Sequence, residues 1–296
     1  MRVVISGASG LIGSALSRFL LEHGHDVAHL VRRTPRSANE IAWDPARGQI
    51  DADALAEYDA IVHLAGAGVG DKRWTNAYKR EILESRVNGT RTIAEALAHH
   101  PSTPRIFICG SAIGIYGDTG SNAVTEASPR GSGFLADVVV AWERAAQPAI
   151  DAGVRVAFAR TGLVAAPSAG AFGKLLPLFK LGLGGKLGSG RQYWSLISLR
   201  DEIRALEFLL THDLHGIFNL TGPEPRTNSD VTKALGAALH RPALFPVPAF
   251  ALRLVVGEFA SDITGSQRVL PQRLQEAGFS FLDASLEQTI ATVLRA

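Results

Sequence analysis

The stretch Met1-Arg-Val-Val-Ile-Ser-Gly7-Ala-Ser-Gly10-Leu-Ile-Gly13 places a short apolar run directly before three glycines and the start of a helical pattern. This arrangement predicts a strand, a tight turn and a helix. Gly7 permits the turn, Gly10 leaves room for phosphates, and Gly13 lets the helix pack on the strand. The first amides of such a helix face an anion, which the helix dipole also favours. We therefore expect a dinucleotide pyrophosphate here; the alternative is a glycine-rich α/β turn that binds nothing.

Length and charge narrow the possible classes of protein. The 296 residues suffice for one large α/β unit or two joined lobes, and the net charge is only +2 with no long basic run. Nucleic acid and membrane surfaces are therefore not expected as partners. The single cysteine, Cys109, fits a reducing compartment, and prolines and charges interrupt the apolar stretch 243–260. We expect a cytoplasmic protein without a signal peptide, acting as a monomer or homodimer.

Strand-like and helix-like segments alternate along the first half of the chain. The strand candidates are near-continuous apolar runs, which predict a parallel sheet buried on both faces. The expected fold class is α/β, a Rossmann-type doubly wound parallel sheet with a smaller C-terminal substrate lobe. We expect residues 1–164 and about 196–222 in the dinucleotide domain, and about 165–195 and 223–296 in the lobe. The expected strands are Val3–Ser6, Asp26–Val31, Ala60–Ala65, Arg105–Cys109, Val154–Ala159 and Ile217–Leu220, and the main helices are Leu11–His23, Thr75–His99 and Phe134–Ala152.

The residues after the second strand indicate which nicotinamide cofactor fits. Val31 is followed by Arg32 and Arg33, where NAD-selective sites place a carboxylate for the ribose 2′-hydroxyl. A carboxylate would repel a 2′-phosphate, whereas a guanidinium binds it through two hydrogen bonds. The sequence therefore predicts NADP (NADPH), with Arg32 favoured because it comes first. Alternatively, both arginines lie in a solvated loop beside Arg36.

Two further stretches follow later strands: His63-Leu-Ala-Gly66-Ala67 and Ser111-Ala-Ile-Gly-Ile-Tyr116-Gly117. With the glycine triplet, they resemble the extended short-chain dehydrogenases/reductases, which include sugar-nucleotide epimerases and dehydratases. The chain is most similar to an atypical branch, the epimerase family proteins (family 39U). The matching features run its full length and include Arg73-Trp74, Glu84-Ser85-Arg86, Arg160-Thr161-Gly162, Gly188-Ser-Gly-Arg191-Gln192 and Asn219-Leu-Thr-Gly-Pro223.

The resemblance implies cofactor contacts along the carboxyl ends of the strands. Leu64 and Ala65 would pass the adenosine side, and the Leu163 backbone would lie by the nicotinamide. Glu81 and Arg86 would flank the cleft. The alternatives are core packing for Leu64, a solvated helix face for Glu81 and a surface ion pair for Arg86. The expected cofactor-binding residues are Gly7, Ser9, Gly10, Leu11, Ile12, Gly13, Arg32, Arg33, Leu64, Ala65, Gly66, Glu81, Arg86, Ser111, Arg160 and Leu163.

The resemblance also implies a Tyr with a Lys four residues later on one helix, but no such pair occurs in this chain. Aligned on Glu143, the Tyr becomes Leu135 and the Lys becomes Val139, and neither side chain transfers protons. The remaining candidate catalytic residues are Ser111 and Tyr116, for which turn closure and packing are the alternatives. We expect Glu143 to be a helix-surface or capping residue.

The second half of the chain suggests where a substrate binds. Lys186 and Arg191 lie among glycines, and two cations there suit a small anionic substrate; a flexible solvated loop is the alternative. Asp201 is expected to cap the next helix. No Cys, His and carboxylate set has metal-ligand spacing, so no metal is expected. The predicted function is an NADP-dependent oxidoreductase or epimerase of unknown substrate; the alternative is a non-catalytic NADP(H)-binding sensor or partner protein.

Overall fold

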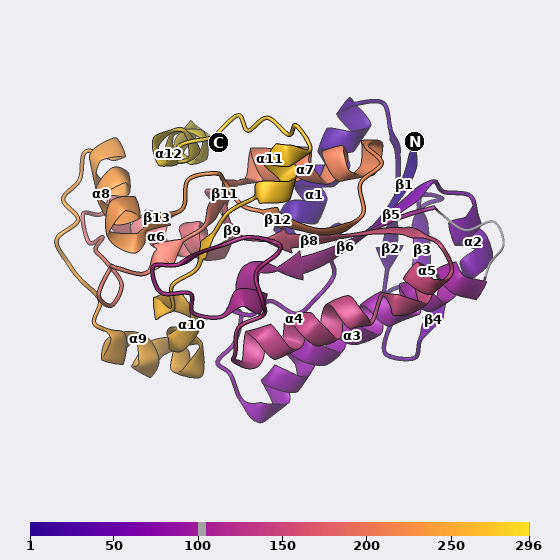
Figure 1. Ribbon diagram of the computed structural model, residues 1–296, viewed down its shortest axis with the longest axis horizontal. Helices are drawn as coiled ribbons and strands as arrows, with labels where there is room; N and C mark the ends of the chain where they lie inside the picture. Colours follow the sequence, from indigo (N-terminus) through magenta and orange to yellow (C-terminus); the bar gives the residue numbers. More distant parts are fainter. Residues whose placement is uncertain (100–104, 296) are drawn as a thin grey trace.

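The computed structural model describes residues 1–99 and 105–295, through which a central eight-stranded sheet runs (Figure 1). The strand order is β12-β8-β6-β5-β1-β2-β3-β4, and within this sheet only β3 and β4 pair antiparallel. The order reverses at β1, where parallel sheets bind ligands beyond the carboxyl ends of their strands. The predicted α/β fold class is confirmed. The strands are β1 (Arg2–Ser6), β2 (Asp26–Val31), β3 (Glu40–Asp44), β4 (Gln49–Ile50), β5 (Ala60–His63), β6 (Ile106–Ala112), β8 (Arg155–Thr161) and β12 (Gly216–Leu220).

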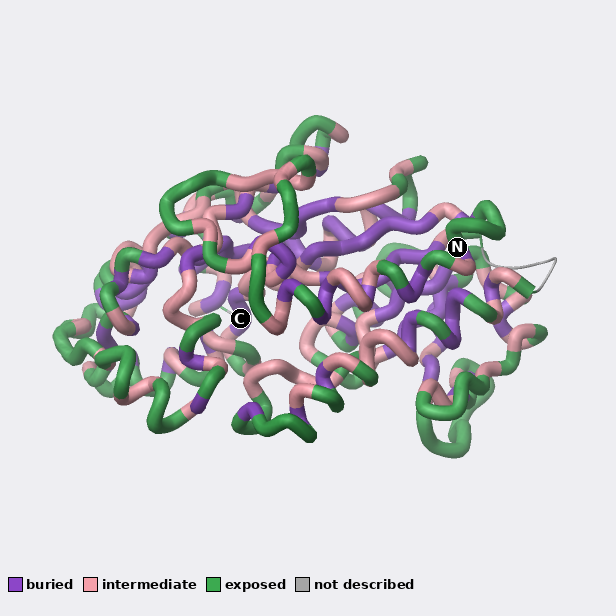
Figure 2. The backbone as a smooth tube through the Cα atoms, turned by 60° about the horizontal axis from the view of Figure 1, so that its bottom comes forward, coloured by how far each residue is buried: buried purple, intermediate pink, exposed green. Residues whose placement is uncertain are grey.

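Helices cover both faces of the sheet because its strands are apolar on both sides. Along β1, Val3 and Ile5 pack with one core cluster and Val4 with the other. The central strands are accordingly buried along most of their length (Figure 2). On one face lie α1 (Leu11–Glu22) and α7 (Leu199–Thr211); on the other lie α3 (Asn76–His99), α4 (Phe134–Arg144) and α5 (Gln147–Asp151) (Figure 1).

Two local predictions were wrong. The single helix expected over 134–152 is divided into α4 and α5, and Pro148 lies in the first turn of α5. Proline fits that first turn but would remove a hydrogen bond from a continuous helix. The sheet also contains β3 and β4, which we did not predict. In β3, Ile41 and Trp43 point into the core and alternate with more exposed residues.

Parts of the second half of the chain, other than β8, α7 and β12, gather around a separate apolar core in which Phe172, Phe179, Leu235 and Ile290 take part; we call these parts the lobe. Residues 272–279 depart from the lobe, because Leu274 packs into the core of the sheet. Among the described residues, no helix is long and apolar enough to cross a bilayer. The lobe contains α6 (Gly170–Lys180), α8 (Asn228–Ala238), α9 (Ala249–Val256), η2 (Gly257–Phe259), α10 (Ala260–Thr264) and α12 (Leu286–Arg295), with the pairs β9 (Leu163–Ala165)–β11 (Leu196–Ser198) and β10 (Tyr193–Trp194)–β13 (Arg226–Thr227). The remaining elements are α2 (Ala52–Ala56), η1 (Ile113–Tyr116), β7 (Ala123–Val124), β14 (Arg268–Val269) and α11 (Gln272–Glu276).

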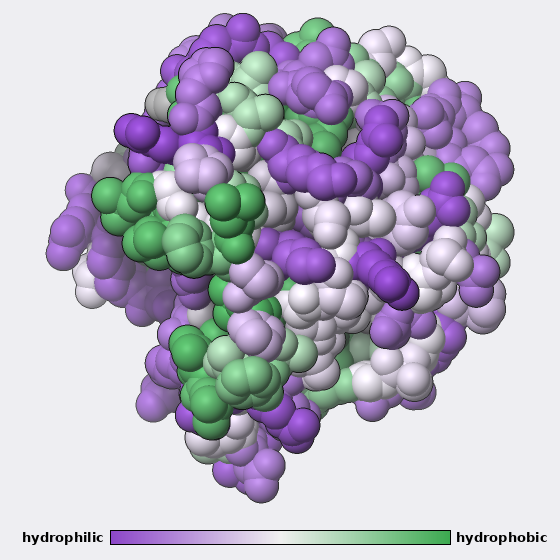
Figure 3. Space-filling view, turned by 90° about the vertical axis from the view of Figure 1, so that its left-hand side faces the viewer, coloured by the Kyte–Doolittle hydropathy of each residue, from purple (hydrophilic) through white to green (hydrophobic). Residues whose placement is uncertain are grey.

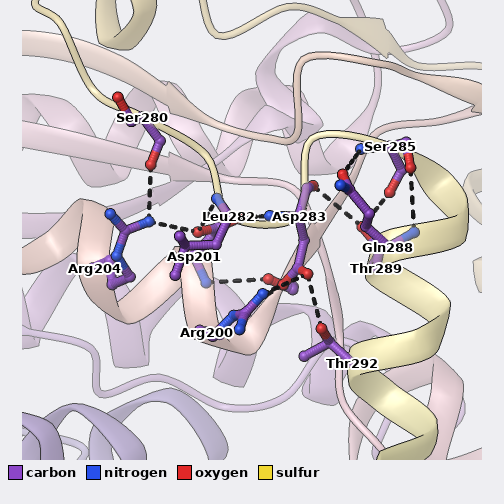
Figure 4. Close-up of polar contacts among 11 residues, drawn as sticks. Arg200, Asp201, Arg204, Ser280, Leu282, Asp283, Ser285, Gln288, Thr289 and Thr292 are labelled. Atoms are coloured by element: carbon purple, nitrogen blue, oxygen red, sulfur yellow. Dashed lines mark hydrogen bonds and ion pairs between the residues drawn. The ribbon is translucent and has the colours of Figure 1, made fainter.

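Buried carboxylates fasten the C-terminal segment to α7 (Figure 4). Asp201 accepts hydrogen bonds from the backbone N–H groups of Leu282 (3.0 Å) and Asp283 (2.8 Å). Arg200 donates to the Asp283 carboxylate at 2.7 and 3.2 Å. The expectation that Asp201 caps α7 was wrong, because Ser198 is the N-cap and accepts from the Asp201 N–H. The Asp201 carboxylate is thereby free to bind backbone eighty residues away.

Removing the Asp283 carboxylate should loosen this attachment. We expect Asp283→Ala to lower the free energy of unfolding by about 1–3 kcal/mol, because the hydrogen bonds that the buried carboxylate accepts from Arg200 and Thr292 are lost. Urea denaturation measures the change. Leu282→Ala is the matched control, since its side chain is half exposed. Equal stability of the Asp283 variant and the parent protein would contradict this account.

Glu202 is a second buried carboxylate on α7. Its Oε1 accepts from Thr161 Oγ1 at 2.7 Å, whereas its buried Oε2 has no partner among the described residues. Burial raises the pKa of Glu202 to about 8. The folded state therefore retains a proton that the unfolded state releases, so the stability that Glu202 contributes falls as the pH rises from about 4.5 to about 8.

Glu202→Gln should remove this pH dependence, since an amide carries no titrating proton. We expect the melting temperature of the variant to fall less than that of the parent between those two pH values, and to be about 2–6 °C higher at the alkaline end. Differential scanning calorimetry across the pH range makes the comparison. Parallel curves for the two proteins would mean that Glu202 is ionised in the folded state.

Candidate functional site

The site begins at the turn between β1 and α1. Gly7 has a φ of +71°, in the left-handed region that favours glycine. A Cβ atom on Gly7 would lie 2.8 Å from the Leu64 carbonyl carbon and from the Ala65 nitrogen. The turn is therefore pressed against the end of β5, and no other residue fits at this position.

The other two glycines have different surroundings. A Cβ atom on Gly13 would lie 2.3 Å from the Gly7 carbonyl oxygen, so Gly13 is required for the packing of α1 on the turn. A Cβ atom on Gly10 would meet only that same oxygen, at 3.2 Å. Helix α1 also has no side-chain N-cap and no acidic residue in its first turn. The amides that follow Gly10 at Leu11 and Ile12 are therefore open to an anion.

The two arginines after β2 differ in their partners. Arg33 is held by Glu40, with its guanidinium nitrogens 2.8 and 2.6 Å from the two carboxylate oxygens. Hydrogen bonds from Arg33, and from the Arg36 amide, lower the pKa of Glu40 to about 2. Arg32 is exposed and makes no ion pair with any described residue. Arg32 is thus the guanidinium free to bind a ligand, and Arg33 is already neutralised by Glu40.

The end of β5 is organised around a buried hydrogen bond. Ser6 Oγ lies 2.6 Å from His63 Nδ1 and accepts from the Leu64 and Ala65 amides, so we assign its proton to the bond with His63. Burial, with a smaller contribution from Arg86, lowers the pKa of His63 to about 3, and the ring is neutral. These bonds fix the backbone that contacts Gly7, which gives Leu64 and Ala65 a structural role at the cleft.

Arg86 is a half-buried cation with no carboxylate in ion-pair range among the described residues. It donates to the carbonyl oxygens of Ala67 (2.8 Å) and Ile82 (3.1 Å), and its guanidinium lies 5.0 Å from the centre of the Trp142 ring. A Cβ atom on Gly66 would lie 3.3 Å from Arg86. Burial lowers the pKa of Arg86 to about 10. The surface ion pair considered as an alternative for Arg86 is absent from this part of the chain.

A chain of buried polar groups crosses the carboxyl ends of β6, β8 and β12. Arg160 binds both oxygens of Glu143 at 2.8 Å and donates to Tyr116 Oη at 2.9 Å. Ser111 Oγ donates to the same Glu143 carboxylate at 2.6 Å, and Tyr116 Oη donates to Asn219 Oδ1 at 2.8 Å. Glu143 is therefore not the surface or capping residue that we expected: it is the shared acceptor of this network.

Ser111 and Tyr116, the two residues that we considered for catalysis, both use their hydroxyl groups in hydrogen bonds of this network. Tyr116 has both hydroxyl hydrogen bonds made within the protein, and burial raises the pKa of its phenol. Ser111 is almost fully buried and directs its proton to Glu143. Arg160, 5% exposed, uses its guanidinium inside the network, which argues against a direct cofactor contact. Leu135 and Val139, at the positions of the Tyr and the Lys, pack in apolar clusters.

The other predicted residues are spread around the cleft. Glu81 is exposed and lies 3.4 Å from Lys72. The Leu163 amide donates to the Ser195 carbonyl at 2.9 Å, which fixes the backbone where β9 begins. Arg191 lines a surface cleft of about 300 Å³ with Asp118, Tyr193 and Ser266. Lys186 is exposed, and its stem lies against Gly190 rather than in that cleft.

Sequence reasoning missed Glu40, Glu143 and Asn219. For Glu143 the sequence did contain a signal. It follows Val139, at the expected Lys position, by four residues, and therefore lies on the face of α4 that was expected to carry the catalytic pair. Asn219 was a matched motif residue, but its hydrogen bond to Tyr116 joins residues 103 positions apart. No local pattern indicates such a bond, so the sequence alone offered no signal for it.

Breaking the Arg160–Glu143 pair should be costly. We expect Glu143→Ala to lower the free energy of unfolding by about 3–5 kcal/mol, because it leaves the Arg160 charge buried without compensation. Replacing both partners, as Glu143→Leu with Arg160→Met, should recover most of the loss. Guanidinium denaturation of the three proteins tests this. A double variant as unstable as the single one would show that the pair is not the source of the effect.

Comparisons with known proteins agree with this architecture. The model of the NAD dependent epimerase/dehydratase family matches residues 3–222, and a domain of unknown function, DUF1731, matches residues 247–293. An epimerase family protein of Mycobacterium leprae is 44% identical, over 94% of this chain and 91% of its own. The human epimerase family protein SDR39U1 is 34% identical, over 98% of this chain and 100% of its own.

A solved structure is similar over the whole chain. The crystal structure of human SDR39U1 with NADPH superimposes with a TM-score of 0.91 and 30% sequence identity, and covers 100% of this chain and 99% of that one. The predicted resemblance is therefore confirmed, and the chain belongs to the NAD dependent epimerase/dehydratase family, among the epimerase family proteins similar to SDR39U1.

Proposed function

We propose that this protein binds NADP(H) and acts as an oxidoreductase or epimerase on a small anionic substrate. The observation that carries the proposal is the free guanidinium of Arg32, at the end of β2, beside a turn that leaves the first amides of α1 open. A diphosphate fits those amides, and a 2′-phosphate fits a guanidinium that no carboxylate neutralises. The NADPH in the crystal structure of human SDR39U1 supports the same choice.

Arg86 supplies a second cation to this site. Its position against Gly66 places it beside the turn that leaves β5, and two of its guanidinium nitrogens make no hydrogen bond with a described residue. A desolvated arginine without a carboxylate favours an anionic or hydroxyl-bearing ligand, such as a phosphate or ribose. We assign to Arg86 a contact with the cofactor on the side opposite Arg32.

The chain's own residues hold the reactants but do not supply the usual acid. Bound NADP(H) would provide or accept the hydride. The fold fixes the cofactor and the lobe closes one side of the cleft, so proximity contributes part of the rate. Because Tyr116 and Ser111 are engaged and Leu135 and Val139 are apolar, the proton has to come from water or from the substrate itself.

The lobe indicates the class of substrate. Residues 152–200 contain no Asp or Glu, and this stretch includes both Lys186 and Arg191. Neither ammonium nor guanidinium group is neutralised by a carboxylate of the described residues. A carboxylate or phosphate on the substrate would find Arg191 in the cleft and a second cation, Lys186, five residues earlier on the same loop. The protein functions in the cytoplasm as a monomer or homodimer, without nucleic acid.

The buried network favours one other function. Because Ser111 and Tyr116, the two candidate catalytic residues, are engaged within the fold, a protein that only binds NADP(H) would also look like this. It would act as a sensor or partner whose lobes respond to the cofactor. Stopped-flow mixing of the NADPH-loaded protein with a panel of anionic carbonyl compounds separates the two. Oxidation at 340 nm supports the enzyme, and tight binding without turnover across the panel supports the sensor.

Selectivity for NADPH should depend on Arg32. We expect Arg32→Ala to weaken NADPH binding by about tenfold to a hundredfold, since a charged hydrogen-bonded contact is worth about 1.5–3 kcal/mol. NADH binding should change little. Arg33→Ala is the matched control, because Glu40 already neutralises Arg33. Isothermal titration calorimetry of protein freed from nucleotide measures both affinities. An equal loss of affinity for NADPH and NADH would contradict the assignment of Arg32 to the 2′-phosphate.

A further inference from the structure

Two loops of the lobe meet and expose large apolar side chains. The Phe245 amide donates to the Gly184 carbonyl at 3.1 Å, and the Val247 amide donates to the Lys186 carbonyl at 2.9 Å. The residues that these bonds bring together include four with strongly exposed side chains. These are Leu181, Leu183, Leu244 and Phe245, of which Leu244 is 76% exposed.

Helix α9 follows directly and continues this surface. None of its eight residues is buried, although its sequence is Ala-Phe-Ala-Leu-Arg-Leu-Val-Val. Phe250, Leu254 and Val255 are each at least 70% exposed. Figure 3, which faces this end of the molecule, shows hydrophobic side chains gathered in two neighbouring groups. We call the seven side chains on the two loops and α9 the apolar end.

The apolar end is positively charged. The segments 170–191 and 241–257, which build it, contain six Lys and Arg residues and no Asp or Glu. Lys180, Arg241 and Arg253 are exposed beside its apolar side chains. Glu258, the first acidic residue after α9, is held by Lys79 at 2.7 Å. The acidic residues nearest in sequence, Glu258 and Asp262, come after α9 on η2 and α10. Exposed apolar side chains on segments that carry cations and no carboxylate indicate a surface that contacts something apolar and negatively charged.

We propose that the apolar end docks on the surface of a bilayer rich in anionic phospholipid. Its side chains would enter the boundary between headgroups and acyl chains, while the adjacent cations bind lipid phosphates. A second copy of the chain fits less well, since a symmetric contact through this face would bring the same cations together. The net charge of +2 led us to expect no membrane partner, but net charge averages over the chain and conceals this local excess. The proposal rests on Lys180, Arg241 and Arg253 and does not need Lys186 or Arg191, so it is independent of the proposed cofactor and substrate sites.

Flotation of the full chain with vesicles tests the proposal. We expect binding to vesicles made of equal parts phosphatidylcholine and phosphatidylglycerol, weaker binding as salt is added, and little binding to phosphatidylcholine alone. Phe250→Ser with Leu254→Ser should lower the partition coefficient by about tenfold or more. Leu21→Ser with Ile150→Ser is the matched control, because it removes two exposed apolar side chains from other elements, and this variant should bind as the parent does.

Binding of NADPH, measured on each variant, shows that the fold is retained and keeps this test separate from the cofactor proposal. Three results would contradict the proposal that the apolar end docks on anionic bilayers. The first is absence of binding to the anionic vesicles. The second is equal binding by the parent protein and the Phe250 and Leu254 variant. The third is a dimer in sedimentation velocity that the same two substitutions abolish, since the apolar end would then be covered by a second copy.

Discussion

The contact between the Gly7 turn and the end of β5 is the constraint on which the rest of the site depends. Backbone meets backbone there, and no side chain can be placed between them at Gly7. The contact is possible because Ser6 accepts the Leu64 and Ala65 amides and holds the neutral ring of His63. The direction of α1, and with it the direction of its open amides, follows from this packing of the turn on the adjacent parallel strand.

The arginines near the candidate site divide into two that pair with a carboxylate and two that do not. Arg32 and Arg33 directly follow β2, whereas Arg86 lies on α3 and Arg160 near the end of β8. Arg33 and Arg160 are bound to carboxylates, and their charges are used within the protein. Arg32 and Arg86 have none in the described part of the chain, which is why the proposed function assigns these two to a ligand. Sequence reasoning assigned all four to the cofactor, because the sequence shows the arginines but not that Glu40 and Glu143 pair with Arg33 and Arg160.

The sequence predicted those parts of the structure that depend on residues close together in the chain. The glycine triplet specifies the β1 turn, and apolar runs specify the central strands, so the fold class and the cofactor edge could be inferred. Short elements such as β3 were missed because five residues give little periodicity. The bonds of Asp201 to the C-terminal segment and of Tyr116 to Asn219 span about eighty residues or more. Such contacts depend on the tertiary fold, and no window of sequence contains both partners.

The buried network explains why loss of the Tyr and Lys pair leaves an ordered edge rather than a cavity. Leu135 and Val139 make α4 apolar where the related dehydrogenases are expected to carry the Tyr and the Lys, and one turn further Glu143 directs its carboxylate to Arg160 and Ser111. An ion pair in this position adds little net stability, because desolvation offsets most of its attraction. It does hold β6, β8 and α4 in one arrangement, since each buried partner needs the others. A proton carrier introduced at Leu135 would therefore meet a surface whose polar groups are already paired, and the chemistry proposed for this site takes its proton from outside the network.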